Sequence, residues 1–176
     1  MEKAVRDISK LQCWSLLPLR LIVGYGSMAH GNAKLARGPD NFAAVLQALG
    51  VPQAHFMSWL TIIIELAGGA VILLGAFVRF AILPMAAVLV TAMLTVHLPF
   101  GFSSIKLQAI TPHGAQFGPP GYEIDLLYLA CMATLALAGA GPFAIDGLIR
   151  KRLGATAAGF YKPSGRYGIQ NNSTKR

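Results

Sequence analysis

A single carboxylate, Glu65, lies within a long apolar stretch of the sequence, residues 55–79. The stretch is long enough to cross a bilayer, and an ionisable side chain at that depth costs roughly 2.5–3.5 kcal/mol on membrane-insertion scales. Two interpretations of Glu65 are open. It forms a buried pair with Arg20 or Lys34 that fixes the register of two helices, or it handles protons and hydrogen bonds in a pocket for a small, mostly apolar molecule.

Four further ionisable side chains fall at a similar depth in the predicted helices: His30, Lys34, His97 and Glu123. Polar side chains in membrane spans face the interior of the protein, so we expect packed helices to bring several of these groups together near Glu65. Each also has a structural interpretation. Glu123 and Asp125 fall in a first helical turn, where carboxylates favour the helix dipole, and His97 ends a helix. His30 and His97 could ligate haem iron, but no other haem feature accompanies them.

The composition is that of a membrane protein. Of the 176 residues, 55% are hydrophobic and only 12% are charged, against a usual charged share of about 25%. Apolar segments of the length that spans a bilayer recur four times, at about 14–33, 55–77, 80–99 and from 121 towards 146. The predicted fold is all-α, an integral membrane four-helix bundle. Residues 41–50 are too short to span and predict an interfacial or re-entrant helix.

The basic residues predict the orientation. The formal net charge is +8, but the positive residues cluster beside the apolar segments and at the C-terminus. We therefore expect them to set topology and not to bind nucleic acid. The positive-inside rule places both termini of this multi-pass membrane protein in the cytoplasm. The predicted parts are a cytoplasmic leader (1–13), a membrane domain (14–150) and a basic flexible cytoplasmic tail (151–176).

Two stripes of small residues predict where helices approach closely. At 100° per residue, one stripe of the first segment carries Arg20, Gly24, Ser27, Gly31 and Lys34. Small side chains at such positions let membrane helices pack backbone against backbone. A second stripe in the last segment consists of Ala130, Thr134 and Ala138.

The order and spacing of several short motifs resemble the DoxX family of small bacterial membrane proteins. The motifs are the arginine of the first segment, Gly31-x-x-Lys34-Leu35, Leu49-Gly50-Val-Pro52, Glu65-x-x-Gly68-Gly69, Leu74-Gly75 with Arg79, His97, Gly121-Tyr-Glu123, and Gly139-x-Gly141-Pro142 with Asp146 and Gly147. Together they cover about residues 14–150. The resemblance implies a four-helix membrane fold and a part in quinone or thiol redox chemistry, as in the quinone-linked DoxD/DoxA enzyme of thiosulfate oxidation.

The resemblance leads to a functional hypothesis with named residues. Glu65, His97 and Glu123 are the predicted catalytic residues, and Arg20, His30 and Lys34 are predicted to bind a quinone cofactor; no metal site is expected. The chain has no outward-facing cysteine for sulfur chemistry, so a partner would have to supply that chemistry. The expected partners are the lipid bilayer and either another protein or a second copy of the chain. The alternative is a non-catalytic membrane assembly or scaffold protein, or a small-molecule carrier.

Overall fold

The structure of this chain, a computed structural model, describes the backbone of residues 2–149 and the side chains of residues 14–149. The predicted tail, 151–176, lies outside the described residues. The predicted leader is part of the first helix, which begins at Glu2 and is therefore longer than the segment expected from the apolar pattern.

The chain is mostly helical, and the helices that end at Arg37, Leu74 and Ala138 are each followed directly by a glycine. The elements in chain order are α1 (Glu2–Arg37), α2 (Pro39–Ala48), α3 (Ala54–Leu74), α4 (Val78–Ala92), a π-helix η1 (Met93–His97), a 3₁₀ turn η2 (Leu98–Phe100), β1 (Leu107–Thr111), β2 (Gly114–Phe117) and α5 (Glu123–Ala138). The predicted short helix is α2. The all-α prediction is wrong in one detail, because β1 and β2 form an antiparallel hairpin within the predicted loop.

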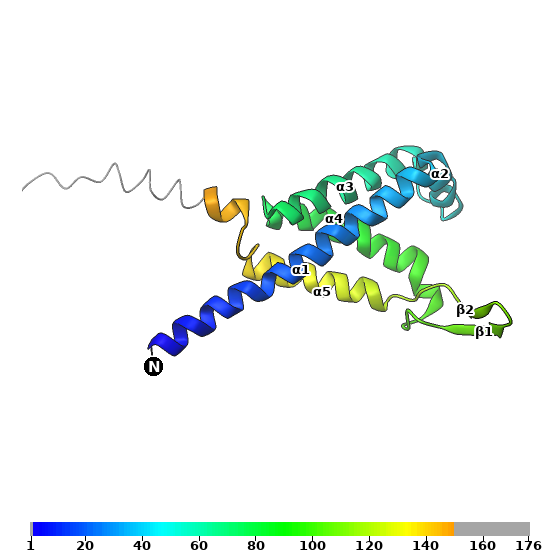
Figure 1. The fold of residues 1–176 in the computed structure, drawn as a ribbon. Helices are drawn as coiled ribbons and strands as arrows, with labels where there is room; N and C mark the ends of the chain where they lie inside the picture. The colour runs from blue at the N-terminus through cyan, green and yellow to red at the C-terminus, as the bar shows by residue number, and fades with distance from the viewer. Residues whose placement is uncertain (1, 150–176) are drawn as a thin grey trace, which may run out of the picture.

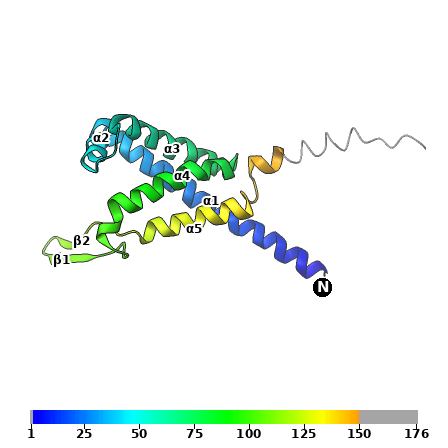
Figure 2. The same cartoon turned by 180° about the vertical axis from the view of Figure 1, so that it is seen from behind.

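The long helices pack in sequence, α1 on α3, α3 on α4, α4 on α5 and α5 back on α1. Both views show α2 and the β1–β2 hairpin at the same end of the molecule, called here the hairpin end (Figures 1 and 2). The α3–α4 turn and the segment that follows α5 lie at the opposite end. Seen from either side, α1 and α5 cross and then diverge towards the hairpin end.

Two helical stretches of the described chain are long and apolar enough to cross a membrane, Ala54–Leu74 and Val78–Phe100. The helix α5 is apolar but has 16 residues, which span roughly 24 Å at a rise of 1.5 Å per residue, less than a hydrocarbon core of about 30 Å. The number of spans and the side on which the termini lie stay predictions.

The first predicted stripe of small residues is confirmed as a packing surface, because α3 packs directly on the small residues of α1. A Cβ atom added to Gly69 would lie 2.7 Å from the carbonyl oxygen of Gly24, and one added to Gly31 would lie 3.1 Å from the Cβ of Glu65. The second predicted stripe, on α5, does not form a packing surface within this chain. Ala130 and Thr134 are exposed, and α5 buries the face that carries Met132 and Leu135.

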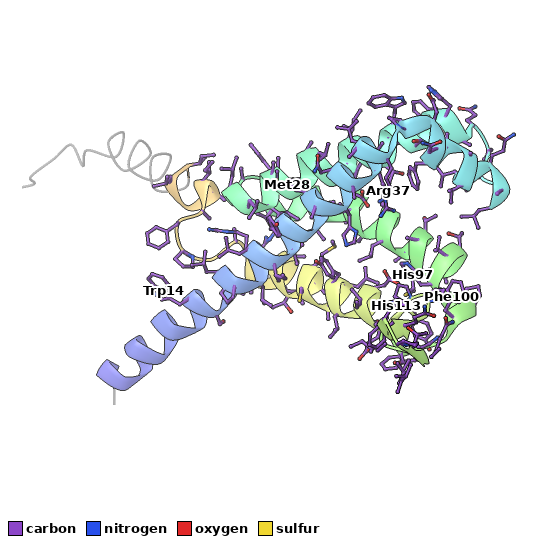
Figure 3. The ribbon with its side chains drawn as sticks, turned by 45° about the vertical axis from the view of Figure 1, so that its right-hand side comes forward. Trp14, Met28, Arg37, His97, Phe100 and His113 are labelled. Atoms are coloured by element: carbon purple, nitrogen blue, oxygen red, sulfur yellow. The ribbon has the colours of Figure 1, made fainter. Side chains whose placement is uncertain are left out.

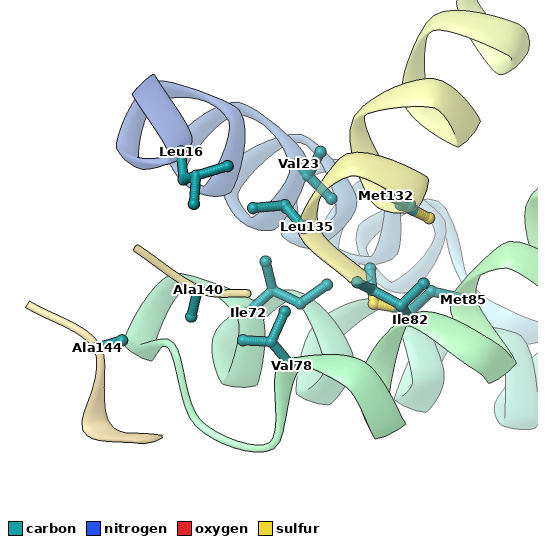
Figure 4. Packing of buried hydrophobic residues seen from close by; sticks show 10 residues of the cluster. All are labelled: Leu16, Val23, Ile72, Val78, Ile82, Met85, Met132, Leu135, Ala140 and Ala144. Carbon is teal, nitrogen blue, oxygen red and sulfur yellow. The ribbon is translucent and has the colours of Figure 1, made fainter. Parts of the chain in front are cut away.

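The core lies near the end opposite the hairpin (Figure 4), where four helices and the segment after α5 meet. Its apolar residues are Leu16, Val23, Ile72, Val78, Ile82, Met85, Met132, Leu135, Ala140 and Ala144. Residues 139–147, called here the strap, cross this end. Asp146 fastens the strap to the start of α4, since its carboxylate accepts hydrogen bonds from the amides of Phe77 (2.8 Å) and Val78 (3.4 Å).

The close approach of α1 and α3 yields a prediction with a matched control. Gly69→Ala should lower the free energy of unfolding by about 1–3 kcal/mol, because the new methyl group meets the rigid backbone of α1. Gly68→Ala gains the same helix propensity, but its methyl group would meet only the side chain of Met85. Thermal unfolding in detergent should rank the stabilities as wild type and Gly68→Ala above Gly69→Ala. Equal stability of the two variants would contradict the packing described.

Candidate functional site

The Glu65 carboxylate pairs with Lys34. The Nζ atom of Lys34 lies 2.5 Å from Oε1 and 2.6 Å from Oε2 of Glu65, so one ammonium group contacts both oxygens. The side chains are 25% and 14% exposed. The Lys34 ammonium also lies 5.2 Å from the centre of the Phe42 ring on α2. The Lys34 ammonium therefore neutralises the Glu65 carboxylate and joins α1 to α3. This is one of the two pairings of Glu65 that the sequence analysis left open.

Arg20, the other predicted partner of Glu65, lies at the end opposite the hairpin. Its side chain is buried, with 3% of the residue exposed, and its Nη1 donates hydrogen bonds to the carbonyl oxygens of Ala140 (2.7 Å) and Pro142 (3.0 Å) in the strap. The guanidinium group is thus stabilised by carbonyl groups beyond the end of α5, where positive charge is favoured by the helix dipole. The Arg20–Glu65 pairing is excluded, and Arg20 lies apart from the other predicted site residues.

A second ionisable pair joins η1, which continues α4, to α5. The Nδ1 atom of His97 lies 2.6 Å from Oδ2 of Asp125, and the side chains are 27% and 5% exposed. His97 is the last residue of the π-helix η1. A π turn adds a residue to a helical turn and so changes the direction of the side chains that follow it; such turns are rare and are frequent at functional sites. Figure 3 shows His97 near the hairpin end, below the end of α1 marked by Arg37.

Glu123 fastens a loop and does not contact His97. Its Oε2 accepts a hydrogen bond from the amide of Ser104 (3.0 Å), and its own amide donates to the carbonyl of Phe102. The hydroxyl of Ser104 in turn accepts from the amide of Ile124. The first turn of α5 therefore holds the chain that leads into the hairpin. This arrangement agrees with the structural interpretation of Glu123 as a residue of the first helical turn.

The ionisable side chains that were expected to gather near Glu65 instead form two separate pairs, Lys34–Glu65 and His97–Asp125. His30 is exposed on α1, and no hydrogen bond or ion pair between described residues joins the Lys34–Glu65 pair to the His97–Asp125 pair. Within residues 14–149 there is also no cluster of three or more potential metal ligands.

An open hollow at the turn between α2 and α3 lies away from both pairs. Its lining consists of Gln47, Val51, Gln53, Ala54, His55 and Phe56. The one titratable side chain there, His55, pairs with Asp40 at 3.1 Å, and both are mostly exposed. Solvent weakens such a pair, so we place the candidate site at His97 and Asp125.

Asp125 is the site residue that the sequence analysis did not select. It was interpreted as a carboxylate of the first helical turn, whereas it is buried and holds His97. A signal for it is present in the sequence. Asp125, Met132 and Leu135 recur at spacings of 7 and 10 residues, which places them on one helical face, and Glu123 lies off that face.

The Lys34–Glu65 pair can be tested by a double-mutant cycle. Lys34→Gln and Glu65→Gln should each lower the free energy of unfolding by about 1–3 kcal/mol, because each leaves one charge half-buried without its partner. The double variant should lose less than the sum, with a coupling above about 1 kcal/mol. In the parallel cycle of Arg20→Gln with Glu65→Gln, the losses should add. If Arg20 and Glu65 were coupled and Lys34 and Glu65 were not, Glu65 would pair with Arg20 instead of Lys34.

Comparison with known proteins supports the family resemblance. A family model for DoxX matches residues 15–98, which include Lys34, Glu65 and His97. An uncharacterized membrane protein of Mycobacterium tuberculosis is 29% identical over 156 residues, covering 82% of this chain and 86% of the relative. An uncharacterized protein of Haemophilus influenzae is 26% identical over 150 residues, covering 84% of this chain and 100% of the relative. No solved structure matches the chain. Residues 15–98 therefore match the DoxX family, as the order of the motifs predicted.

Proposed function

We propose that this protein is an integral membrane subunit of a quinone-linked or thiol-related redox system in the bacterial inner membrane. The His97–Asp125 pair carries the proposal, because it is a proton-carrying group held in a defined orientation between two helices. In this role the chain supplies a proton-handling site near the outer face, and a partner protein or a second copy takes part in the electron transfer. Both termini lie in the cytoplasm.

The geometry of the pair assigns a role to each of its two side chains. An ionised carboxylate only accepts hydrogen bonds, so a charged Asp125 would hold the proton of His97 on Nδ1 and leave the lone pair on Nε2. Among the described residues, Nε2 has no hydrogen-bond partner. The ring is also more exposed than the carboxylate that orients it. Nε2 can therefore take a proton from a bound molecule, or return one to it, while Asp125 keeps the ring in place.

The residues around His97 suit a quinone head group. The carbonyl oxygens of a quinone accept hydrogen bonds, which a protonated imidazole can donate at Nε2. The neighbouring side chains of Leu94, Leu98 and Phe100 are large, apolar and exposed, so a lipid-soluble ring can reach the histidine through an apolar surface. A bound quinone would supply the redox centre, which takes up or releases protons with its electrons.

The two ionisable pairs then have different roles. Lys34 and Glu65 satisfy each other and join α1 to α3, which is the arrangement expected of a structural pair that fixes helix register. His97 and Asp125 leave one hydrogen-bonding atom unused. From the set predicted to be catalytic, the proposal therefore gives proton transfer to His97, whereas Glu65 and Glu123 position the helices and the loop around it.

The alternative, a non-catalytic assembly or scaffold protein, is favoured by the Lys34–Glu65 pair alone. In that case His97 and Asp125 would form a second structural tie, and replacing either would lower stability without affecting any ligand. The measurement that separates the two functions is therefore ligand binding and not stability alone.

Quinone binding tests the proposal. The wild-type protein, purified in mild detergent, should retain quinone in its extracted lipids, and added decylubiquinone should raise its unfolding temperature, because a ligand that binds only the folded state stabilises it. His97→Gln and Asp125→Asn should each abolish or strongly reduce that rise. His113→Gln, which changes an exposed histidine in the hairpin turn, should leave it unchanged. If no quinone is retained and none stabilises the wild type, the redox proposal is wrong and the scaffold role is preferred.

A further inference from the structure

A tyrosine one helical turn from Asp125 occupies an unusual position at the crossing of α1 and α5. Tyr128 lies three residues after Asp125, and residues at that spacing are neighbours on a helix, with Cβ atoms roughly 5–6 Å apart. The Tyr128 ring is half-buried and packs against the apolar core. Asp125 and Tyr128 therefore both project from the buried side of α5, with Asp125 nearer the hairpin end.

The position of the Tyr128 hydroxyl depends on a glycine of α1. A Cβ atom built on Gly26 would lie 1.9 Å from the Tyr128 hydroxyl oxygen and 2.9 Å from Cζ. Any other residue at position 26 would displace the phenol group. The glycine lets the hydroxyl lie directly against the backbone of α1 and fixes its position at the helix crossing.

Within the described residues, the Tyr128 hydroxyl has no hydrogen-bond partner. Polar atoms in protein interiors are nearly always hydrogen-bonded, and in a membrane there is little water to satisfy the remainder. A phenol group both donates and accepts hydrogen bonds. The hydroxyl of this half-buried ring lies against Gly26 and bonds no described residue, so it is free to bond a ligand atom.

Two hydrogen-bonding atoms belong to neighbours of Asp125, and each is without a partner among the described residues. One is Nε2 of His97, at the end of η1, and the other is the hydroxyl of Tyr128, held against α1. We propose that the Tyr128 hydroxyl forms a second hydrogen bond to the molecule that binds at His97. That molecule is an apolar ring bearing carbonyl or hydroxyl oxygens. This inference rests on the proposed function and adds a residue that determines how the head group is oriented.

The test is the single-atom change Tyr128→Phe, which keeps the ring packed against Gly26 and removes only the hydroxyl. It should weaken the binding of decylubiquinone about five- to tenfold, the usual effect of losing one hydrogen bond. The unfolding temperature of the ligand-free protein should not fall. With quinone labelled with ¹³C at its carbonyl groups, infrared difference spectra of the wild type should show one carbonyl band lowered in frequency by this hydrogen bond, and the variant should lose that shift.

Tyr122→Phe is the matched control, since Tyr122 packs edge-on against Phe102 at the start of α5 and its hydroxyl has no part in the proposal. It should bind quinone like the wild type. If the wild type binds quinone, His97→Gln weakens binding and Tyr128→Phe does not, the role of Tyr128 is wrong while the proposed function stands. A loss of ligand-free stability in Tyr128→Phe would show a structural hydrogen bond instead. If the wild type binds no quinone, both proposals are wrong.

Discussion

The contact between the backbones of α1 and α3 at Gly24 and Gly69 determines the positions of most other groups. Membrane helices are not driven together by the hydrophobic effect, because lipid is as apolar as the side chains, so they depend on close van der Waals packing. The glycines allow that packing. Once the two helices touch there, Lys34 lies opposite Glu65 near one end of α1, and Arg20 lies under the strap near the other.

Three buried or half-buried ionisable groups are stabilised in three different ways. Glu65 is neutralised by a lysine, Arg20 is surrounded by carbonyl groups at the ends of helices, and Asp125 is paired with a histidine. The first two arrangements use the charged group for structure. The third leaves Nε2 of His97, an atom that can take up or release a proton, without a partner in the described chain, next to apolar side chains that a lipid-soluble molecule could reach. The Nε atom of Arg20 also has no partner, but it is fully buried. This difference places the proposed chemistry at His97, even though Glu65 is the more conspicuous charge in the sequence.

Much of the helical organisation follows from residue types alone. The apolar segments predicted the two helical stretches that are long enough to span a membrane, and the short amphipathic segment predicted α2. The small residues of α1 predicted the face on which α3 packs. The motifs also predicted the family. The hairpin was missed because its strands are short and exposed on both faces, so they lack the alternation of apolar and polar residues by which a half-buried strand is recognised.

The sequence by itself determined which charges are costly and which face of α1 packs, because insertion energies and helical periodicity depend only on residue type and spacing. It left open whether Glu65 pairs with Lys34 or Arg20, and it assigned Asp125 to the helix end. Those outcomes depend on the direction in which helices cross and on the π turn that orients His97. The contacts of His97 and Tyr128 join residues far apart in the chain, so only the tertiary structure decided that His97 pairs with Asp125 and that Tyr128 lies against Gly26.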